Sequence, residues 1–272
     1  MRSRAPSSLQ AYDHLADRIR QHRQANDDPV LIVEGPDDQL VLRDHLPSVA
    51  IFPANGRVNA VSAARSLLGW GIERFVCVTD RDFEDPEGRG EIAQVLYPYD
   101  RRDLESMLVA LGVLALVLDH QGSRDKIAAE GGSGMLVQRI EKVVEPITRL
   151  RAWNAEDGLA LAFDEVDLAS KVDQRLLALA VQSYCAALVG VSATSATIPE
   201  AVNVAESSDE QVPDPSGKDV ITVAGVALRK VAGTLSKAAA AEPQLSAQVR
   251  SSAGLALSRS DWMRGLISRL SA

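Results

Sequence analysis

The chain has 272 residues, of which 46% are hydrophobic and 24% are charged, and its formal net charge is -8. This composition is typical of a globular protein and excludes a disordered or fibrous chain. The acidic balance argues against a protein that coats DNA or RNA non-specifically, because such proteins are usually basic. It does not exclude a nuclease, whose acidic site recruits cations before it meets phosphate.

The sequence predicts a cytoplasmic protein without a membrane anchor. The longest apolar stretch, residues 107–118, is too short to span a bilayer. A signal peptide is not expected, because charged side chains such as Asp17 lie where its apolar core would be needed. The two cysteines, Cys77 and Cys185, lie in apolar runs and indicate buried free thiols rather than a disulfide or zinc site.

Residues 1–112 alternate between predicted helices and strands, beginning with a helix over residues 7–25. Short apolar runs predict strands at residues 30–33, 49–53, 74–79 and 94–97. Helices are expected from Pro36, from about Asn59, and after Asp100 as the N-cap residue. This alternation predicts an α/β fold with a parallel sheet flanked by helices.

Residues 113–272 are expected to form a mainly helical C-terminal region. Apolar residues follow a helical period over residues 136–150, 177–188 and 262–270. Residues 200–217 are rich in Ser, Pro, Asp and Glu, which predicts a loop. Because acids and histidines at strand ends are few here, we expect a platform for a partner or substrate rather than a second catalytic unit.

Acidic side chains follow two of the predicted strands. Glu34 follows the first strand, with Asp38 four residues later, and Asp80 and Asp82 follow the third strand. The carboxyl ends of parallel strands meet at one edge of a sheet, so these acids are expected to lie together. Crowded carboxylates repel one another, and a divalent cation relieves that repulsion. Mg²⁺ prefers such oxygen ligands and Mn²⁺ can substitute for it, so the sequence predicts a magnesium site.

Each of these acids also has a structural alternative. An Asp after a strand is usually a turn former or helix cap, and this is the commoner role for any one acid taken alone. The set as a whole favours the metal site, and Gly35 allows the backbone to pass close to a ligand.

Two segments resemble the Toprim domain of topoisomerases, primases and small nucleases. Its hallmarks are a Glu-Gly pair after the first strand and an Asp-x-Asp after a later strand. Residues 31–38 (LIVEGPDD) and 78–85 (VTDRDFED) match both hallmarks in order and spacing. The resemblance covers about the first 110 residues and implies a Toprim-like fold there.

The resemblance also implies a role for each acid. Glu34 would be a metal ligand and a general base, and Asp80 and Asp82 would be metal ligands. Asp38 matches the second acid in the first motif of nucleases of the overcoming-lysogenization-defect type.

A second resemblance covers residues 97–108 (YPYDRRDLESML). This segment is similar to one that follows the Asp-x-Asp in the domain-of-unknown-function family 4435. That family joins a Toprim core to a helical tail, and its relatives include the toxic nuclease of the PARIS anti-phage system. The resemblance implies that Glu105 is a further metal-site acid, with a surface position as the alternative. For Asp103, the alternative to a site role is a helix cap.

Two basic residues are candidate phosphate contacts. Lys218 lies in a Gly-Lys-Asp sequence that resembles the same family, and Arg57 follows a glycine in a predicted turn. An ordinary solvated surface position is the alternative for both residues.

The expected function is that of a Mg²⁺-dependent endonuclease that hydrolyses phosphodiester bonds in DNA or RNA. The resemblance further implies an effector of anti-phage defence. Because the chain has no Walker A sequence, an ABC-type ATPase partner would be a separate protein. Two alternatives stay open: a non-catalytic interaction module that partners an ATPase, and a Toprim ribonuclease that matures structured RNA.

Overall fold

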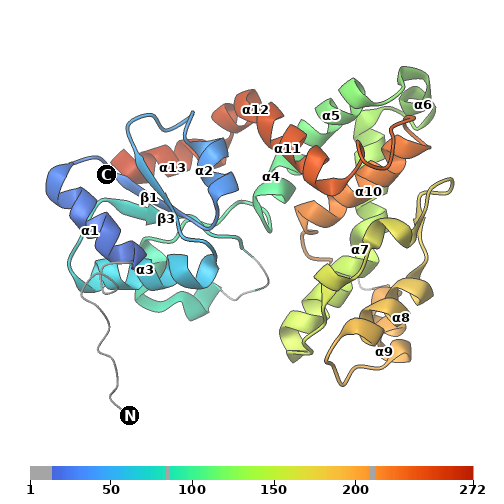
Figure 1. Cartoon of the computed structure of the whole chain (residues 1–272), viewed down its shortest axis with the longest axis horizontal. Helices are drawn as coiled ribbons and strands as arrows, with labels where there is room; N and C mark the ends of the chain where they lie inside the picture. Colours follow the sequence, from blue (N-terminus) through green and yellow to red (C-terminus); the bar gives the residue numbers. More distant parts are fainter. Residues whose placement is uncertain (1–13, 82, 84–85, 209–211, 272) are drawn as a thin grey trace, which may run out of the picture. The chain divides into compact units, whose positions relative to one another are not determined.

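The computed structural model describes residues 14–81, 83, 86–208 and 212–271 (Figure 1). The chain forms two compact units, one of Met1–Asp100 with Leu257–Ala272 and the other of Arg101–Ala256. The sequence placed the division after residue 112 and assigned the whole C-terminal region to the helical part. The structure instead groups the last helix with the α/β unit.

A small parallel sheet forms the centre of the first unit. Its strands are β1 (Val30–Val33), β2 (Ala50–Pro53) and β3 (Phe75–Cys77), in the order β2-β1-β3. β1 pairs in parallel with both neighbours and is buried along its whole length. Four consecutive apolar residues suit a central strand that is covered on both faces. The first three strands therefore lie where the sequence predicted them, to within one or two residues.

The expected fourth strand at residues 94–97 forms only an isolated parallel bridge, between Cys77 and Leu96. Residues 95–99 nevertheless run beside β3 and the residues after it, because backbone hydrogen bonds continue past the bridge. Pro98 has no N–H group and cannot donate to a ladder. Three backbone bonds hold the segment: Cys77 N–H to the Val95 carbonyl, Tyr97 N–H to the Cys77 carbonyl, and Tyr99 N–H to the Thr79 carbonyl.

Helices cover the sheet of the first unit. They are α1 (Leu15–Ala25), α2 (Pro36–Leu42), α3 (Arg57–Gly69) and α13 (Asp261–Ser271), with a 3-10 segment at Pro86–Gln94. α1 and α3 pack together, and their buried residues share one core cluster with Val30 and Ile32 of β1. Residues 7–13 of the expected first helix lie outside the described residues.

The C-terminal helix α13 packs against the segment that follows β3. The Trp262 ring stacks on Tyr97 and Tyr99, with ring centroids 5.6 and 5.1 Å away. Its indole N–H donates to the Pro98 carbonyl at 2.9 Å. These contacts bring the last helix, far away in sequence, into the α/β unit.

The second unit is mainly helical. Its helices are α4 (Leu104–Ala110), α5 (Val113–Gln121), α6 (Arg124–Ala129), α7 (Ser133–Asp157), α8 (Val181–Val191), α9 (Ile198–Ala205), α10 (Gly217–Arg229) and α11 (Glu242–Ser252), and α12 (Gly254–Arg259) follows them. A short hairpin pairs β4 (Val172–Asp173) with β5 (Ala178–Leu179). α10 is buried along most of its length and contacts α4, α5, α7 and α11.

Two local expectations for this unit were wrong. The N-cap of α4 is Asp103 rather than Asp100, and its carboxylate accepts the Ser106 N–H at 2.7 Å. The loop expected over residues 200–217 is helical in its first part, because Thr197 and Glu200 form a capping box that starts α9.

No single helix in the described part of the chain is long and apolar enough to cross a membrane. α4 and α5 reach that length and hydropathy only as a pair, and the pair is bent by 76° at the break between them.

The contact between α4 and α10 gives a stability prediction. A Cβ added at Gly217 would lie 2.3 Å from the Glu105 Cβ and 2.3 Å from the Ser106 backbone N. We expect Gly217→Ala to lower the free energy of unfolding by about 1–3 kcal/mol, because the helices must move apart. Gly134→Ala is the control, since a Cβ there meets nothing within 4 Å. Denaturant midpoints measure both, and an unchanged midpoint for Gly217→Ala would contradict the close approach.

Candidate functional site

The carboxyl edge of the sheet brings Glu34 and Asp80 together. Glu34 directly follows β1 and Asp80 lies three residues beyond β3, and these strands are parallel neighbours. The Glu34 Oε1 atom accepts the backbone N–H of Asp80 at 2.9 Å. Both residues are half-buried. The strand pairing thus places two acids from sequence positions 46 residues apart at one point.

Arg57 lies at the same edge. It is the first residue of α3, after Gly56, whose φ of 117° is accessible to glycine but rarely to other residues. The guanidinium donates to the backbone carbonyl of Asp80 at 2.5 Å. Of the two basic candidates from the sequence, Arg57 is therefore placed beside the acids of the first unit.

Cys77 is the last residue of β3, three residues before Asp80. Burial raises the pKa of its thiol to about 12, the Glu34 carboxylate acts in the same direction, and the Arg57 guanidinium opposes both. The thiol is therefore protonated at neutral pH. Cys77 and Cys185 are both buried free thiols, as the sequence predicted.

Asp38 has a more enclosed setting. It lies in the first turn of α2 with only 9% of its surface exposed. One carboxylate oxygen accepts the Gly35 N–H at 2.7 Å and the other accepts the Tyr99 hydroxyl at 2.5 Å. Burial raises the pKa of Asp38, while the hydrogen bonds from Tyr99 and Gly35 act in the opposite direction. Asp38 thus ties the start of α2 to the segment beyond β3.

Tyr99 is a residue of this edge that the sequence did not single out. Its ring is fully buried against Trp262, and its hydroxyl meets Asp38. The sequence signal that could have pointed to Tyr99 is its place in the aromatic segment at the end of the predicted fourth strand. A parallel strand at that place carries its carboxyl end to the same sheet edge as Glu34 and Asp80.

The donor chemistry at this edge fits a hard divalent cation. Glu34 and Asp80 place carboxylates on adjacent strand ends, and Mg²⁺ is commonly bound by one or two carboxylates together with water. Asp82, the third expected ligand from these two strand ends, lies outside the described residues. Within the ranges that the structure describes, no group of three His, Cys, Asp or Glu side chains is arranged to hold a metal ion.

Glu105 and Lys218 belong to the second unit. Glu105 is buried rather than at the surface, and its carboxylate accepts the Arg250 guanidinium at 2.8 Å. Burial raises the pKa of Glu105, the charge of Asp103 adds to the effect, and Arg250 opposes it. Lys218 is exposed in the first turn of α10. Glu105 thus has a structural partner within its own unit.

Comparisons of the chain with protein-family models, curated proteins and solved structures found no match. The function is therefore argued from the residues and geometry of the chain itself.

The bond between Tyr99 and Asp38 gives a prediction for metal-free protein. Tyr99→Phe removes a donor from a buried carboxylate, so the Asp38 pKa should rise further and stability at pH 7 should fall by about 1–3 kcal/mol. A raised folded-state pKa destabilises the ionised form. The deficit should therefore shrink as the pH falls through the folded pKa toward the unfolded value of about 4. Urea midpoints across this range, with a ¹³C titration of Asp38, measure the effect.

Tyr97→Phe is the matched control. The Tyr97 hydroxyl donates to the Trp262 backbone carbonyl at 3.0 Å, an acceptor that does not titrate. Its loss should therefore cost the same at every pH between 4 and 7. Equal pH dependence for the two variants would show that Tyr99 does not act through Asp38.

Proposed function

We propose that the chain is a Mg²⁺-dependent endonuclease with a Toprim-like α/β domain, which hydrolyses phosphodiester bonds in DNA or RNA. The observation that carries this proposal is the convergence of Glu34, Asp80 and Arg57 at one edge of the parallel sheet. Two acidic residues, whose side chains suit a divalent cation, lie there with an Arg, whose guanidinium suits phosphate.

Each residue has a part in the proposed reaction. Glu34, Asp80 and Asp82 would hold the ion, with Asp38 as a further acid of the first unit. When bound, Mg²⁺ or Mn²⁺ supplies charge stabilisation at the phosphate oxygens and lowers the pKa of a bound water. Glu34 would accept the proton of the attacking water. Arg57 would pair with the phosphate, where a planar guanidinium can donate two parallel hydrogen bonds.

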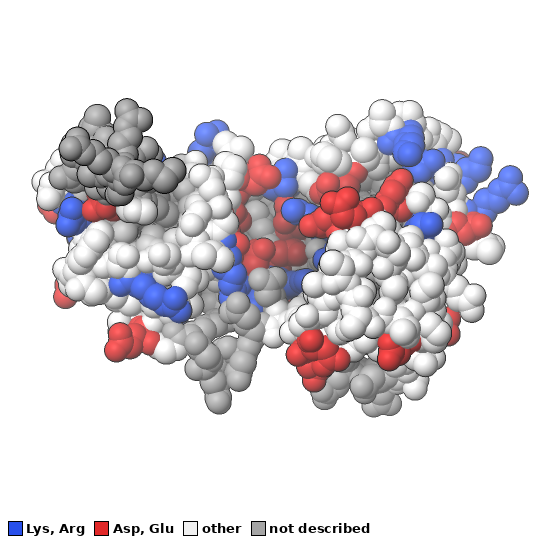
Figure 2. Space-filling model, turned by 60° about the horizontal axis from the view of Figure 1, so that its bottom comes forward, with Lys and Arg blue, Asp and Glu red and all other residues white. Residues whose placement is uncertain are grey.

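The proposed wider role is that of a cytoplasmic effector of anti-phage defence, working with a separate ABC-type ATPase. Support comes from the sequence resemblance and from the surface charge. On the face that Figure 2 shows, described Lys and Arg side chains lie in small groups beside Asp and Glu side chains. Such a mixed surface, with a net charge of -8, suits docking on a protein partner better than non-specific coating of nucleic acid.

A non-catalytic interaction module is the second candidate. Asp38 provides the specific observation for it, since both carboxylate oxygens accept hydrogen bonds from the protein itself. An acid used in this way stabilises the fold without a ligand. Substitution of the other acids decides between the nuclease and the interaction module, because only a nuclease needs them for cleavage.

Asp80→Asn tests the catalytic role. Both hydrogen bonds described for Asp80 run through its backbone, so the amide side chain leaves them in place. If Asp80 is a ligand, cleavage should fall by at least about 100-fold. Substitution of residues that only hydrogen-bond to a metal ligand already lowers metal affinity or activity by about 10–100-fold. Single-stranded DNA, duplex DNA and transfer RNA are incubated with Mg²⁺, with and without any ATPase encoded beside the gene.

Asp44→Asn is the control, because this Asp is exposed and its only ion-pair partner among the described residues is the neighbouring Arg43, at 3.4 Å. It should cleave as fast as the wild type. Equal rates for wild type and Asp80→Asn would eliminate the catalytic assignment. An inactive wild type on every substrate, with and without partner, would favour the interaction module, and cleavage of transfer RNA alone would favour RNA maturation.

Metal binding is measured separately from cleavage. Mg²⁺ and Mn²⁺ should each raise the midpoint of thermal unfolding of the wild type, because a ligand of the folded state stabilises it. The rise should be smaller for Glu34→Gln and for Asp80→Asn. Excess chelator should abolish both the shift and cleavage, and undiminished cleavage under chelator would contradict the metal mechanism.

A further inference from the structure

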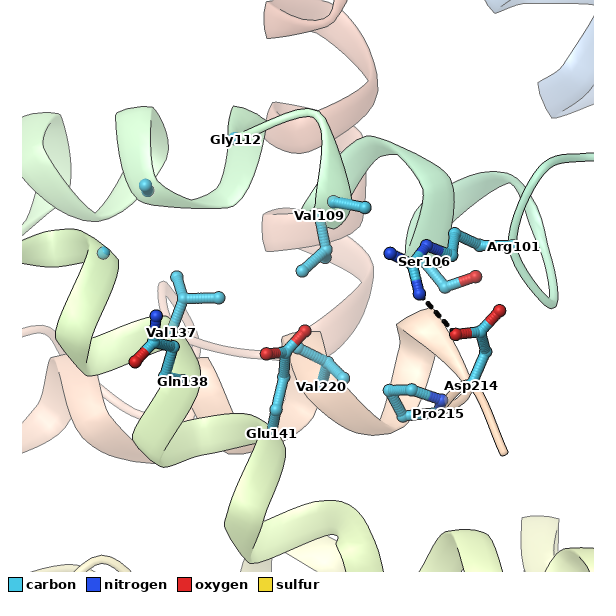
Figure 3. Close-up of a pocket in the computed structure, with 13 residues that line it drawn as sticks. Arg101, Ser106, Val109, Gly112, Val137, Gln138, Glu141, Asp214, Pro215 and Val220 are labelled. Carbon is cyan, nitrogen blue, oxygen red and sulfur yellow. Dashed lines mark hydrogen bonds and ion pairs between the residues drawn. The ribbon is translucent and has the colours of Figure 1, made fainter. Parts of the chain in front are cut away.

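A cavity of about 390 Å³ lies within the second unit, lined by residues of α4, α5, α7 and α10 (Figure 3). Val109, Val137 and Val220 give it an apolar side. Gly112, Ala115 and Gly134 also line it, and such small residues leave the space between the helices unfilled. A volume of this size is within the range of small-molecule sites.

Among the described residues, three charged side chains line the cavity, and two of them are already paired. The Arg101 guanidinium donates to the Asp214 carboxylate at 2.5 Å. Figure 3 shows this pair on one side and the Glu141 carboxylate pointing into the cavity from α7. Two carboxylates and one guanidinium leave one negative charge uncompensated.

Glu141 is the carboxylate of this lining that receives no hydrogen bond from a described residue. Among the described residues, no hydrogen bond or ion pair reaches its side chain, although Gln138 lies one turn before it in the same lining. Burial raises the pKa of Glu141, the charge of Asp214 acts in the same direction, and that of Arg101 opposes both. Glu141 is half-buried, so a ligand that fills the cavity would take its carboxylate further from water, and a cationic group on that ligand would compensate this cost.

We propose that this cavity binds a small amphipathic cation, in which a primary ammonium or guanidinium group is carried on a short alkyl stem. The cationic head lies against Glu141, and the stem lies against Val109, Val137 and Val220. An anion is disfavoured, because the cavity's guanidinium is already engaged by Asp214. A neutral apolar ligand is disfavoured as well, since it would leave the Glu141 carboxylate unpaired. The proposal is independent of the metal site.

The same head group can come from a free amine or from a lysine or arginine side chain of another protein. Calorimetry on the full chain at pH 8 therefore uses butylamine and butylguanidine as free cations, and Nα-acetyl-lysine-N-methylamide as the side-chain probe. 1-Butanol and butyrate are the neutral and anionic comparisons. We expect at least one cationic class to bind and neither comparison to bind. The tighter class identifies the source, and similar affinity for both supports the shared chemistry.

Glu141→Gln should weaken binding of the cation by about 10-fold or more, because a hydrogen bond to a charged group becomes a neutral one. Glu145→Gln is the matched control, since Glu145 lies one turn further along α7, outside the cavity lining, and faces Arg149 at 3.9 Å. The control should bind like the wild type.

Gly134→Leu tests the cavity without changing a charge. Gly134 lies in the first turn of α7, and a Cβ there meets nothing within 4 Å, so the longer side chain should occupy the open space. Circular dichroism and the unfolding midpoint check that the variant folds. Binding should be lost in the folded variant.

Affinity should also depend on pH through Glu141. Protonation of Glu141 removes the charge that holds the cation, so binding should weaken as the solution is acidified. Because the pKa of Glu141 is raised, this weakening should begin at a higher pH than it would for an ordinary Glu. Arg101 and Asp214 are the other charged groups that face it in the lining, and α5 contributes none.

Failure of every cationic probe, equal binding by wild type and Glu141→Gln, or equally tight binding of butyrate would overturn the proposal.

Discussion

Burial of β1 on both faces is the constraint on which the rest of the first unit depends. Its four residues, Val30–Val33, have no exposed surface, so both faces of the strand must be covered, and both neighbouring strands run parallel to it. Parallel pairing puts the carboxyl ends of adjacent strands at one edge. Glu34 therefore meets the chain that leaves β3, and the Asp80 N–H becomes a donor to its carboxylate. The position of the acids follows from an apolar requirement, before any ligand is considered.

Much of this edge could be predicted because the signals are local. An apolar run that ends in an acid marks both a buried strand and the side chain at its carboxyl end, as at Glu34 and Asp80. The Asp38–Tyr99 bond joins residues 61 apart, and the bond from the Trp262 indole to Pro98 spans 164 residues. Local periodicity carries no information on such pairings. For this reason the division after residue 112 missed the return of α13 to the first unit.

The cap of α4 shows a second limit of local patterns. Asp100 and Asp103 both precede apolar helical residues, and sequence spacing does not separate them. In the structure the Asp103 carboxylate accepts the Ser106 N–H and also the Gly217 N–H, at 3.1 Å, from the start of α10. The second contact comes from a helix more than a hundred residues away. The choice of cap was thus decided by tertiary packing, as was the burial of Glu105 beside Arg250.

Carboxylates with a structural role and carboxylates available to a ligand differ in the donors that the protein supplies. In the second unit, the Asp219 carboxylate accepts two hydrogen bonds from Arg151, at 2.7 and 3.0 Å, and this pair is closed to a ligand. The Asp38 carboxylate is also supplied with donors, since each of its oxygens accepts one hydrogen bond, from Tyr99 or from Gly35. Glu141 lies at the other extreme, because no described donor reaches it and open space lies before it. Glu141 is half-buried, so a ligand that fills this space removes more water from its carboxylate, and a cationic group compensates that loss best.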